Sequence, residues 1–346
     1  MNYYRNIDKS KFNVDFVTTK CDDKILDEIE NNGNKVFILP YRRKKPFTYI
    51  KELKKIVKEN QYDIVHAHGS SSLLLLEMLA AKMGKCKIRI AHSRNTKSDH
   101  PLIHKILYPF FKRSYTAAFA VGEDAGKWLF KEKEFFILKN AQDINKYCYN
   151  EKIRKEMRAK YNIDSDIVLG CVGNFNEQKN HTYLLDIFSL LLNKKNNENY
   201  KLVLIGDGPL KNEIVEKAKK LNVYENIIFT GSSNEVSKWL QACDIMLLTS
   251  KFEGFPNVLI EWQIAGLPCI ISDKITKHVK ITNLVKFQSI DDSPQYWVNT
   301  IKNIKIIDRN LNMESLIDDI TKNGFNITEN VKQLEKKYEK LYKQYK

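Results

Sequence analysis

The chain has 346 residues, 43% of them hydrophobic, and a formal net charge of +15 at pH 7. This length predicts two domains, and the composition excludes disordered and fibrous proteins. The positive charge favours anionic partners, which include phosphorylated substrates, nucleic acid and anionic membrane surfaces. The longest apolar stretch, "SSSLLLLEMLAAKMG", is interrupted by Glu77 before the roughly 20 residues of a membrane helix. Without a signal-peptide pattern, a cytoplasmic protein is expected.

Apolar runs with strand character alternate with amphipathic helical segments, which is typical of parallel α/β folds. The expected strands of the first half are 12–19, 35–40, 63–69, 88–93, 117–122 and 135–140. Those of the second half are 167–174, 201–208, 226–232, 244–250 and 268–273. The expected helices between the later strands are 180–195, 209–222, 234–243 and 255–266. The pattern predicts two Rossmann-like, doubly wound domains facing a cleft, at 1–150 and 151–325.

The two ends of the chain carry separate predictions. Residues 326–346 have apolar or aromatic side chains at helical spacing and a charged opposite face, which predicts a packed C-terminal helix. No nucleic-acid-binding motif accompanies the basic residues, so nucleic acid is not an expected partner. At the start, "MNYYRNID" is interpreted as the end of a first helix and 12–19 as the second strand of a doubly wound sheet. The first strand and the loop after it are therefore expected to be missing.

Metal binding is not expected from the cysteines or the histidines. The six cysteines are scattered singly and are interpreted as buried free thiols. His66 and His68 are interpreted as facing opposite sides of a sheet, where they could not share a metal ion. Asp164 and Asp166 form a DxD pattern, but it precedes a strand and so lies at the wrong sheet edge for a ligand, which favours a turn. No metal and no cofactor are predicted.

Three loops of the second half each follow a strand and carry glycines or charges. They are "VGNFNEQKN" (172–180), "LIGDG" (204–208) and "SKFEGFPNV" (250–258). Because the carboxyl ends of parallel strands meet at one edge of a sheet, the loops are expected to line one ligand site. Gly254 would let the chain approach a ligand closely. The amides of Phe255, Asn257 and Val258, with the dipole of the following helix, would favour an anion such as phosphate.

Two glutamates belong to the last of these segments. Glu253 lies in the loop and Glu261 in the helix that follows. Carboxylates that touched a diphosphate would repel it, so their plausible partners are sugar hydroxyl groups. The alternative is that Glu253 caps the helix and Glu261 is merely solvated.

The stretches "FEGFPNVLIEWQIAGLPCIISD", "LIGDGPLK" and "VGNFNEQKN" resemble the C-terminal domain of glycosyltransferase family 4, retaining enzymes of the GT-B fold that use nucleotide-activated sugars. The resemblance is closest to bacterial enzymes that build capsule and exopolysaccharide, and it extends to "YDIVHAHGS" and "RIAHSRN". It implies a metal-independent enzyme of the hexosyltransferase class. Such an enzyme would take a nucleoside diphosphate sugar, expected to be a UDP-sugar, into its C-terminal domain. Its acceptor, a glycan or a polyprenyl-linked precursor, would bind the N-terminal domain.

The resemblance also implies roles for individual residues. Glu253 would contact the donor sugar, Glu261 the ribose, and Lys179 the diphosphate, where it offsets the charge on the departing nucleotide. His92 matches a family histidine that faces the cleft, and the alternative for it is a core histidine. The implied catalytic residues are thus Glu253, Lys179 and His92. The implied donor-binding residues are Gly173, Asn174, Lys179, Gly206, Gly208, Gly254, Phe255, Pro256, Asn257, Val258 and Glu261. Two positions depart from the family: Asn174 replaces a usual arginine, and Arg94 a common second histidine.

Two stretches, "YRRKKPFTYIKELKKIVKEN" and "HPLIHKILYPFFKRS", combine basic with apolar or aromatic residues and could lie on an anionic membrane surface. The resemblance favours this peripheral location, on the inner face of the cell membrane, because members of the family usually act on lipid-linked acceptors. A core-packed helix with a solvated basic face is the alternative for the first. Two other functions stay open. One is a nucleotide-sugar epimerase of the same fold, and the other is a truncated, non-catalytic sugar-nucleotide binder.

Overall fold

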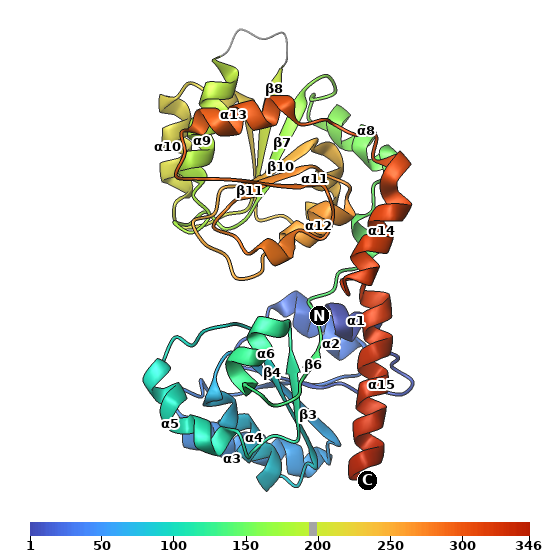
Figure 1. Cartoon of the computed structure of the whole chain (residues 1–346). Coiled ribbons are helices and arrows are strands. Elements are labelled where there is room, and N and C mark those ends of the chain that lie inside the picture. Colours follow the sequence, from blue (N-terminus) through green and yellow to red (C-terminus); the bar gives the residue numbers. More distant parts are fainter. Residues whose placement is uncertain (194–198) are drawn as a thin grey trace. The chain divides into compact units, whose positions relative to one another are not determined.

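The computed structural model describes residues 1–193 and 199–346, which fold into two units (Figure 1). Unit 1 consists of Met1–Ala141 and Ile327–Lys346, and unit 2 of Gln142–Asn326. The division lies earlier than the predicted position 150, because Ile144 and Tyr147 are buried in the core of unit 2. The C-terminal helix belongs to unit 1.

Unit 2 is built on one parallel sheet in which the strands follow the order β12-β11-β10-β7-β8-β9. Its strands are β7 (Ile167–Val172), β8 (Tyr200–Ile205), β9 (Ile227–Gly231), β10 (Ile245–Leu248), β11 (Cys269–Ser272) and β12 (Val285–Gln288). The strands predicted for this half are all present, somewhat shortened at their ends. The sequence did not predict β12, because this edge strand is short and includes the exposed Lys286.

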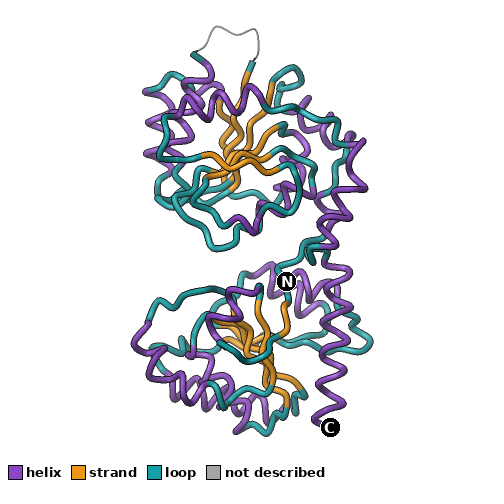
Figure 2. Tube along the Cα trace, viewed as in Figure 1, coloured by secondary structure: helices purple, strands orange, loops and turns teal. Residues whose placement is uncertain are grey.

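Helices cover both faces of this sheet (Figure 2). They are α7 (Ile144–Tyr147), α8 (Glu151–Lys160), α9 (His181–Leu192), α10 (Lys211–Lys220), α11 (Val236–Ala242), α12 (Val258–Ile264), α13 (Pro294–Asn303) and α14 (Met313–Lys322). Alternate residues of β8 join different cores: Val203 packs with Trp262, whereas Leu202 packs with Trp297. This alternation is expected for a strand buried on both faces. The predicted helix 180–195 extends past α9, and its last residues, 194 and 195, lie outside the described residues.

Unit 1 contains two separate parallel sheets, a two-stranded β1-β2 and a four-stranded β3-β4-β5-β6. The strands are β1 (Phe16–Thr18), β2 (Val36–Ile38), β3 (Ile64–Gly69), β4 (Ile88–Ser93), β5 (Ala117–Ala120) and β6 (Phe136–Ile137). The helices are α1 (Asn2–Asn6), α2 (Asp23–Asn31), α3 (Pro46–Asn60), α4 (Leu75–Met83), α5 (Pro101–Phe111), α6 (Glu123–Phe130) and α15 (Ile327–Tyr345). The predicted opening, a helix followed by a strand, is present as α1 and β1.

The C-terminal helix α15 returns to unit 1 and packs against its sheet, as the amphipathic pattern predicts. Leu334 and Leu341 are buried with Ile88 and Ile90 of β4. Glu335 accepts a hydrogen bond of 2.8 Å from the amide of Asp8. The last residues of the chain therefore complete the core of the first unit.

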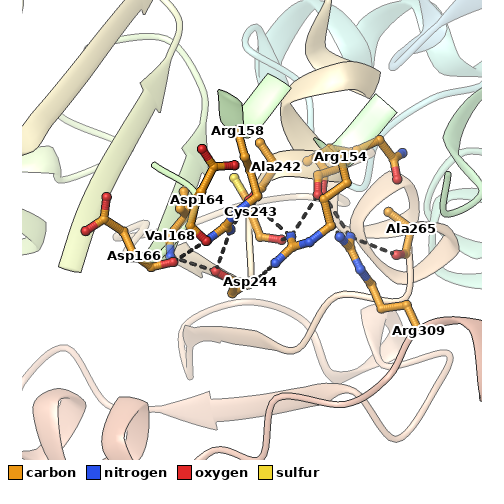
Figure 3. A network of polar contacts seen from close by, with 12 residues as sticks. Arg154, Arg158, Asp164, Asp166, Val168, Ala242, Cys243, Asp244, Ala265 and Arg309 are labelled. Atoms are coloured by element: carbon orange, nitrogen blue, oxygen red, sulfur yellow. Dashed lines mark hydrogen bonds and ion pairs between the residues drawn. The ribbon is translucent and has the colours of Figure 1, made fainter. Parts of the chain in front are cut away.

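A buried ion network connects α8 to the sheet of unit 2 (Figure 3). Asp244, just before β10, binds Arg154 at 2.5 Å and Arg158 at 3.0 Å. Arg158 also donates to the carbonyls of Asp164 and Asp166. These two residues form a turn, as predicted, and the turn is held by its backbone rather than by its carboxylates.

The remaining general expectations concern the cysteines and the membrane. All six cysteines are free; Cys86, Cys171, Cys243 and Cys269 are buried, while Cys21 and Cys148 are half-buried. In residues 1–193 and 199–346, no helix has both the length and the apolar character needed to span a bilayer.

Candidate active site

The three predicted ligand loops of unit 2 lie side by side, because the strands before them are neighbours in the sheet. β7 pairs with β8 on one side and with β10 on the other, and every pair is parallel. The chain winds outward from β7 through β8 and β9, then crosses to β10, so the strand order reverses between β7 and β10. Open α/β sheets bind ligands at such a switch point, outside the carboxyl ends of the strands.

An ion pair between Lys179 and Glu253 lies at this position. Lys179 Nζ is 2.7 Å from Glu253 Oε1, although the residues are far apart in sequence, and their side chains are only 14% and 9% exposed. Ser250 Oγ donates to the same oxygen at 2.9 Å. Gln178 Nε2 donates to Oε2 at 3.0 Å. The structure therefore brings the predicted site residues Lys179 and Glu253 together. Two further residues that sequence reasoning missed, the serine and the glutamine, hold the carboxylate.

The backbone fixes this pair from both loops. The hydroxyl of Thr249 donates to the carbonyls of Lys179 and Asn180 at 3.2 and 3.1 Å, and the amide of Lys251 donates to the carbonyl of Gln178 at 2.8 Å. Asn180 adopts a left-handed conformation (φ 54°), which turns the chain into α9. The loop after β7 and the loop after β10 are thus tied together at the pair.

Close packing between the loops explains why glycines occupy these positions of the predicted site. A Cβ on Gly173 would lie 2.9 Å from Cε of Lys179, so this glycine makes room for the lysine side chain. Gly206 has φ +147°, and a Cβ there would lie 2.1 Å from the carbonyl oxygen of Gly173. A Cβ on Gly208 would lie 2.5 Å from the carbonyl oxygen of Phe175. The loops after β7 and β8 therefore touch through their backbones, and contact of these glycines with a donor stays a prediction.

The loop 254–258 presents backbone donors. Within residues 1–193 and 199–346, the amides of Gly254, Phe255 and Asn257 donate no hydrogen bond. The ring of Phe255 stacks on Phe325, with centroids 5.4 Å apart. Pro256 is buried, and Val258 is the first residue of α12. Because this helix has only seven residues, the free amides rather than a long helix dipole are what the loop offers to an anion.

Glu261 lies in α12 and has a perturbed acidity. Burial raises the pKa of its carboxyl to about 7, while a hydrogen bond from Tyr147 and the charge of Lys146 act in the opposite direction. A carboxyl with a pKa near neutrality changes its charge in the physiological range. Tyr147 was not predicted, since it lies on α7, in the stretch interpreted as a linker. Asn174, at the position where the family usually has an arginine, is exposed.

The predicted histidine of unit 1, His92, is 1% exposed and lies on β4. Its Nδ1 is 3.0 Å from Nε2 of His66 on β3. The rings of His66 and His68 stack with centroids 4.5 Å apart, so the prediction that they face opposite sides is wrong. Residues two apart on a strand share a face, and parallel pairing places His68 beside His92 on that face. The exposed member of the cluster is His68, which sequence reasoning did not assign to a site.

Comparisons with known proteins agree with these observations. A family model described as "Glycosyltransferase Family 4" matches residues 1–135, and one described as "Glycosyl transferases group 1" matches residues 153–286. The protein named "Putative glycosyltransferase EpsF" of Bacillus subtilis (strain 168) is 34% identical over 317 residues, covering 87% of this chain and 82% of its own.

A second relative and a solved structure extend the comparison. The Escherichia coli UDP-Gal:alpha-D-GlcNAc-diphosphoundecaprenol alpha-1,3-galactosyltransferase is 26% identical, covering 83% of this chain and 77% of its own. Among solved structures, Anabaena HepE in complex with UDP and glucose has a TM-score of 0.74 at 14% identity, covering 94% of this chain and 91% of its own. The similarity to HepE concerns the fold. The match to the family models and to EpsF shows that the chain belongs to glycosyltransferase family 4, with the two Rossmann-like domains of the GT-B fold.

Proposed function

We propose that the chain is a retaining, metal-independent hexosyltransferase in capsule or exopolysaccharide biosynthesis. It would move a sugar from a UDP-sugar to a glycan or a polyprenyl-linked acceptor. The observation that carries this proposal is the Lys179–Glu253 pair at the switch point of the unit 2 sheet, beside a loop with free amides. The names of two relatives support the details. That of the Escherichia coli enzyme includes a UDP-Gal donor and a diphosphoundecaprenol acceptor, and that of CapH of Staphylococcus aureus, 27% identical to this chain, includes capsular polysaccharide biosynthesis.

Each side chain of the pair has a chemical role in this proposal. When the sugar leaves, negative charge develops on the nucleoside diphosphate, and a positioned ammonium such as that of Lys179 stabilises it. The amides of Gly254, Phe255 and Asn257 would add uncharged donors on the same side. Glu253, whose oxygens are fixed by Ser250 and Gln178, would accept hydrogen bonds from hydroxyl groups of the donor sugar and orient its anomeric carbon. Asn174 supplies no charge, so Lys179 would supply the positive charge that acts on the diphosphate.

The experiment that tests the proposal starts from the donor. The purified chain is screened for thermal stabilisation by nucleoside diphosphate sugars, and the products formed with polyprenyl diphosphate sugar acceptors are identified by mass spectrometry. A glycosylated acceptor that keeps the anomeric configuration of the donor supports the proposal. An epimerised donor formed without acceptor would support the epimerase alternative, which the glycosyltransferase names of the relatives do not favour. Donor binding without turnover would indicate a non-catalytic binder.

Donor affinity should depend on pH through Glu261, if this residue holds the ribose as a carboxylate. With a pKa of about 7, most Glu261 side chains are ionised at pH 8 and protonated at pH 6. The affinity for UDP should therefore weaken as the pH falls, by about tenfold between pH 8 and pH 6. Isothermal titration calorimetry with UDP at each pH measures this change.

The matched control is Glu261→Gln, which keeps the side-chain volume but cannot ionise. Its affinity for UDP should be weaker than that of the wild type at pH 8 and should vary less with pH. Protonation of UDP itself affects the titrations of both proteins equally, so the comparison between them removes its contribution. Identical pH profiles for the two proteins would contradict the role of Glu261.

We also propose that unit 1 binds an anionic membrane surface through α5. The basic helix α3 packs Tyr49, Leu53 and Val57 into its own core, so its apolar side is not available. By contrast, α5 exposes Leu102 (76%) and Ile106 (68%), and also Phe110, at a spacing that aligns them on one helix face. Lys105, Lys112 and Arg113 are exposed nearby. An apolar stripe bordered by basic side chains is typical of interfacial helices.

The double variant L102S/I106S should bind vesicles containing anionic phospholipids at least about tenfold more weakly than the wild type, because burying one leucine or isoleucine is worth about 1.5–3 kcal/mol. Vesicle co-sedimentation at two salt concentrations measures the loss, and wild-type binding should decrease at the higher salt. Leu311→Ser is the control, since Leu311 is 80% exposed but belongs to unit 2. Equal binding by all three proteins would contradict the role of α5.

A further inference from the structure

Three histidines of unit 1 form a cluster on one face of neighbouring strands. His66 and His68 come from β3 and His92 from β4, and one ring nitrogen of each lies within 4.8 Å of the others. Zinc binds imidazole nitrogens at about 2.0–2.1 Å, which separates two ligands of a tetrahedron by about 3.3 Å. The 3.0 Å between His66 Nε2 and His92 Nδ1 is close to that separation. Small side-chain movements would therefore place the three rings around one ion.

The chemistry of the rings also suits a metal. Each of the three residues offers one imidazole nitrogen as a ligand atom. Neutral imidazole is the form that coordinates metals.

A tyrosine of the C-terminal helix contacts His66 and orients its ring. The hydroxyl of Tyr338, on α15, is 2.6 Å from Nδ1 of His66. If Nε2 of His66 bound a metal, its proton would reside on Nδ1 and be donated to Tyr338, as is usual for metal-bound histidines. The exposed ring of His68 leaves the cluster open to solvent on one side, so an ion can enter and keep a free coordination position.

Arg94, in contrast to Tyr338, opposes the binding of a cation to this cluster. It follows His92 by two residues, and its positive charge acts on all three histidines. A nearby guanidinium repels a cation, whereas it would attract an anion. The charge of Arg94 therefore distinguishes between the two kinds of ligand.

We propose that His66, His68 and His92 form a binding site for a divalent transition-metal ion such as Zn²⁺, with Tyr338 as the positioning residue of His66. Three imidazoles with one open position suit zinc, and also cobalt, nickel or copper. This site replaces the expectation that the histidines could not share a metal, which depended on a wrong assignment of strand faces. It belongs to unit 1, and the test of metal binding does not depend on the proposed function.

The test measures metal binding by the full-length, untagged protein in buffer without phosphate. Equilibrium dialysis with ZnCl₂ should give one bound zinc, and Co²⁺ should give the absorption of a nitrogen-ligated tetrahedral site without a thiolate band. His68→Ala should weaken zinc binding at least tenfold. The side chain of His68 is exposed, so the variant should fold like the wild type, which thermal unfolding without metal checks. Tyr338→Phe should weaken it about tenfold, as is typical for partners of metal ligands. Arg94→Gln should strengthen it, and His278→Ala, an exposed histidine of unit 2, should leave it unchanged.

Several results would overturn the proposal. The first is a wild-type protein that binds no zinc, and the second is unchanged affinity in His68→Ala. A thiolate band with cobalt would assign the metal to cysteines instead. If zinc is not bound but inorganic phosphate shifts the histidine NMR signals, and Arg94→Gln abolishes this shift, the cluster is an anion site.

Discussion

Replacing Glu253 with alanine should abolish sugar transfer while the fold is retained. The expected loss in turnover is at least about 10²–10³-fold, the size of effect seen when one positioned electrostatic group is removed from an active site. The physical reason is that Glu253 is the only acidic partner of Lys179 in the described part of the chain and would orient the donor sugar. Removing it releases the ammonium of Lys179, so UDP should bind at least as tightly as before. Steady-state turnover with donor and acceptor, together with calorimetry for UDP, measures both effects.

Two companion variants define what the loss means. Glu253→Gln keeps the shape of the side chain and its contact with Ser250, so a loss there as well assigns the effect to the charge. Glu177→Gln removes another carboxylate from the same region. Glu177 and its partner, Lys251, are both exposed, and this variant should retain full activity. Full activity in Glu253→Ala would disprove the proposed role of the pair.

Most of the fold of unit 2 and its candidate site could be predicted from the sequence. Strands buried on both faces give continuous apolar runs, as in Ile167–Val172, and the loops after them carry the residues on which the resemblance to the family rests. Parallel topology then places those loops at one sheet edge. For that reason it could be predicted without a structure that Lys179 and Glu253 lie close together.

What the sequence could not predict depends on contacts between distant residues. Gln178 and Ser250 look like ordinary polar loop residues, and only the folded chain shows that both bind the carboxylate of Glu253. Tyr147 lies in a stretch whose polarity suggested a linker, yet it is buried against the core of unit 2. The elevated pKa of Glu261 is likewise a consequence of burial, which one charged residue in a helix does not reveal.

The histidine cluster illustrates a different failure. The strands 63–69 and 88–93 were predicted with nearly correct bounds, but the faces of His66 and His68 were assigned incorrectly, although the period of a strand is sufficient to place them together. The contact with His92 additionally requires the register of β3 and β4, and the contact with Tyr338 requires the return of the C-terminal helix to unit 1. The pattern of a single segment contains neither piece of information.

Asp244→Asn should produce the largest loss of stability in unit 2. Asp244 is 7% exposed, binds Arg154 and Arg158, and accepts a hydrogen bond of 2.8 Å from the amide of Val168 (Figure 3). Neutralising it leaves two arginines near the protein interior without their counter-charge. Breaking a buried ion pair in this way costs about 3–5 kcal/mol. The free energy of unfolding should fall by this amount in urea titrations followed by tryptophan fluorescence.

The measurement reports mainly on unit 2, because Trp239, Trp262 and Trp297 lie there and only Trp128 lies in unit 1. Glu216→Gln is the matched control, since its ion pair with Lys219 is exposed on α10 and such pairs contribute little to stability. At low temperature, where Asp244→Asn is still folded, its donor affinity should equal that of the wild type, because the network is separate from the Lys179–Glu253 pair. An unfolding free energy equal to that of Glu216→Gln would show that the two arginines are satisfied by backbone carbonyls alone, such as those of Ala242 and Cys243, which they already contact.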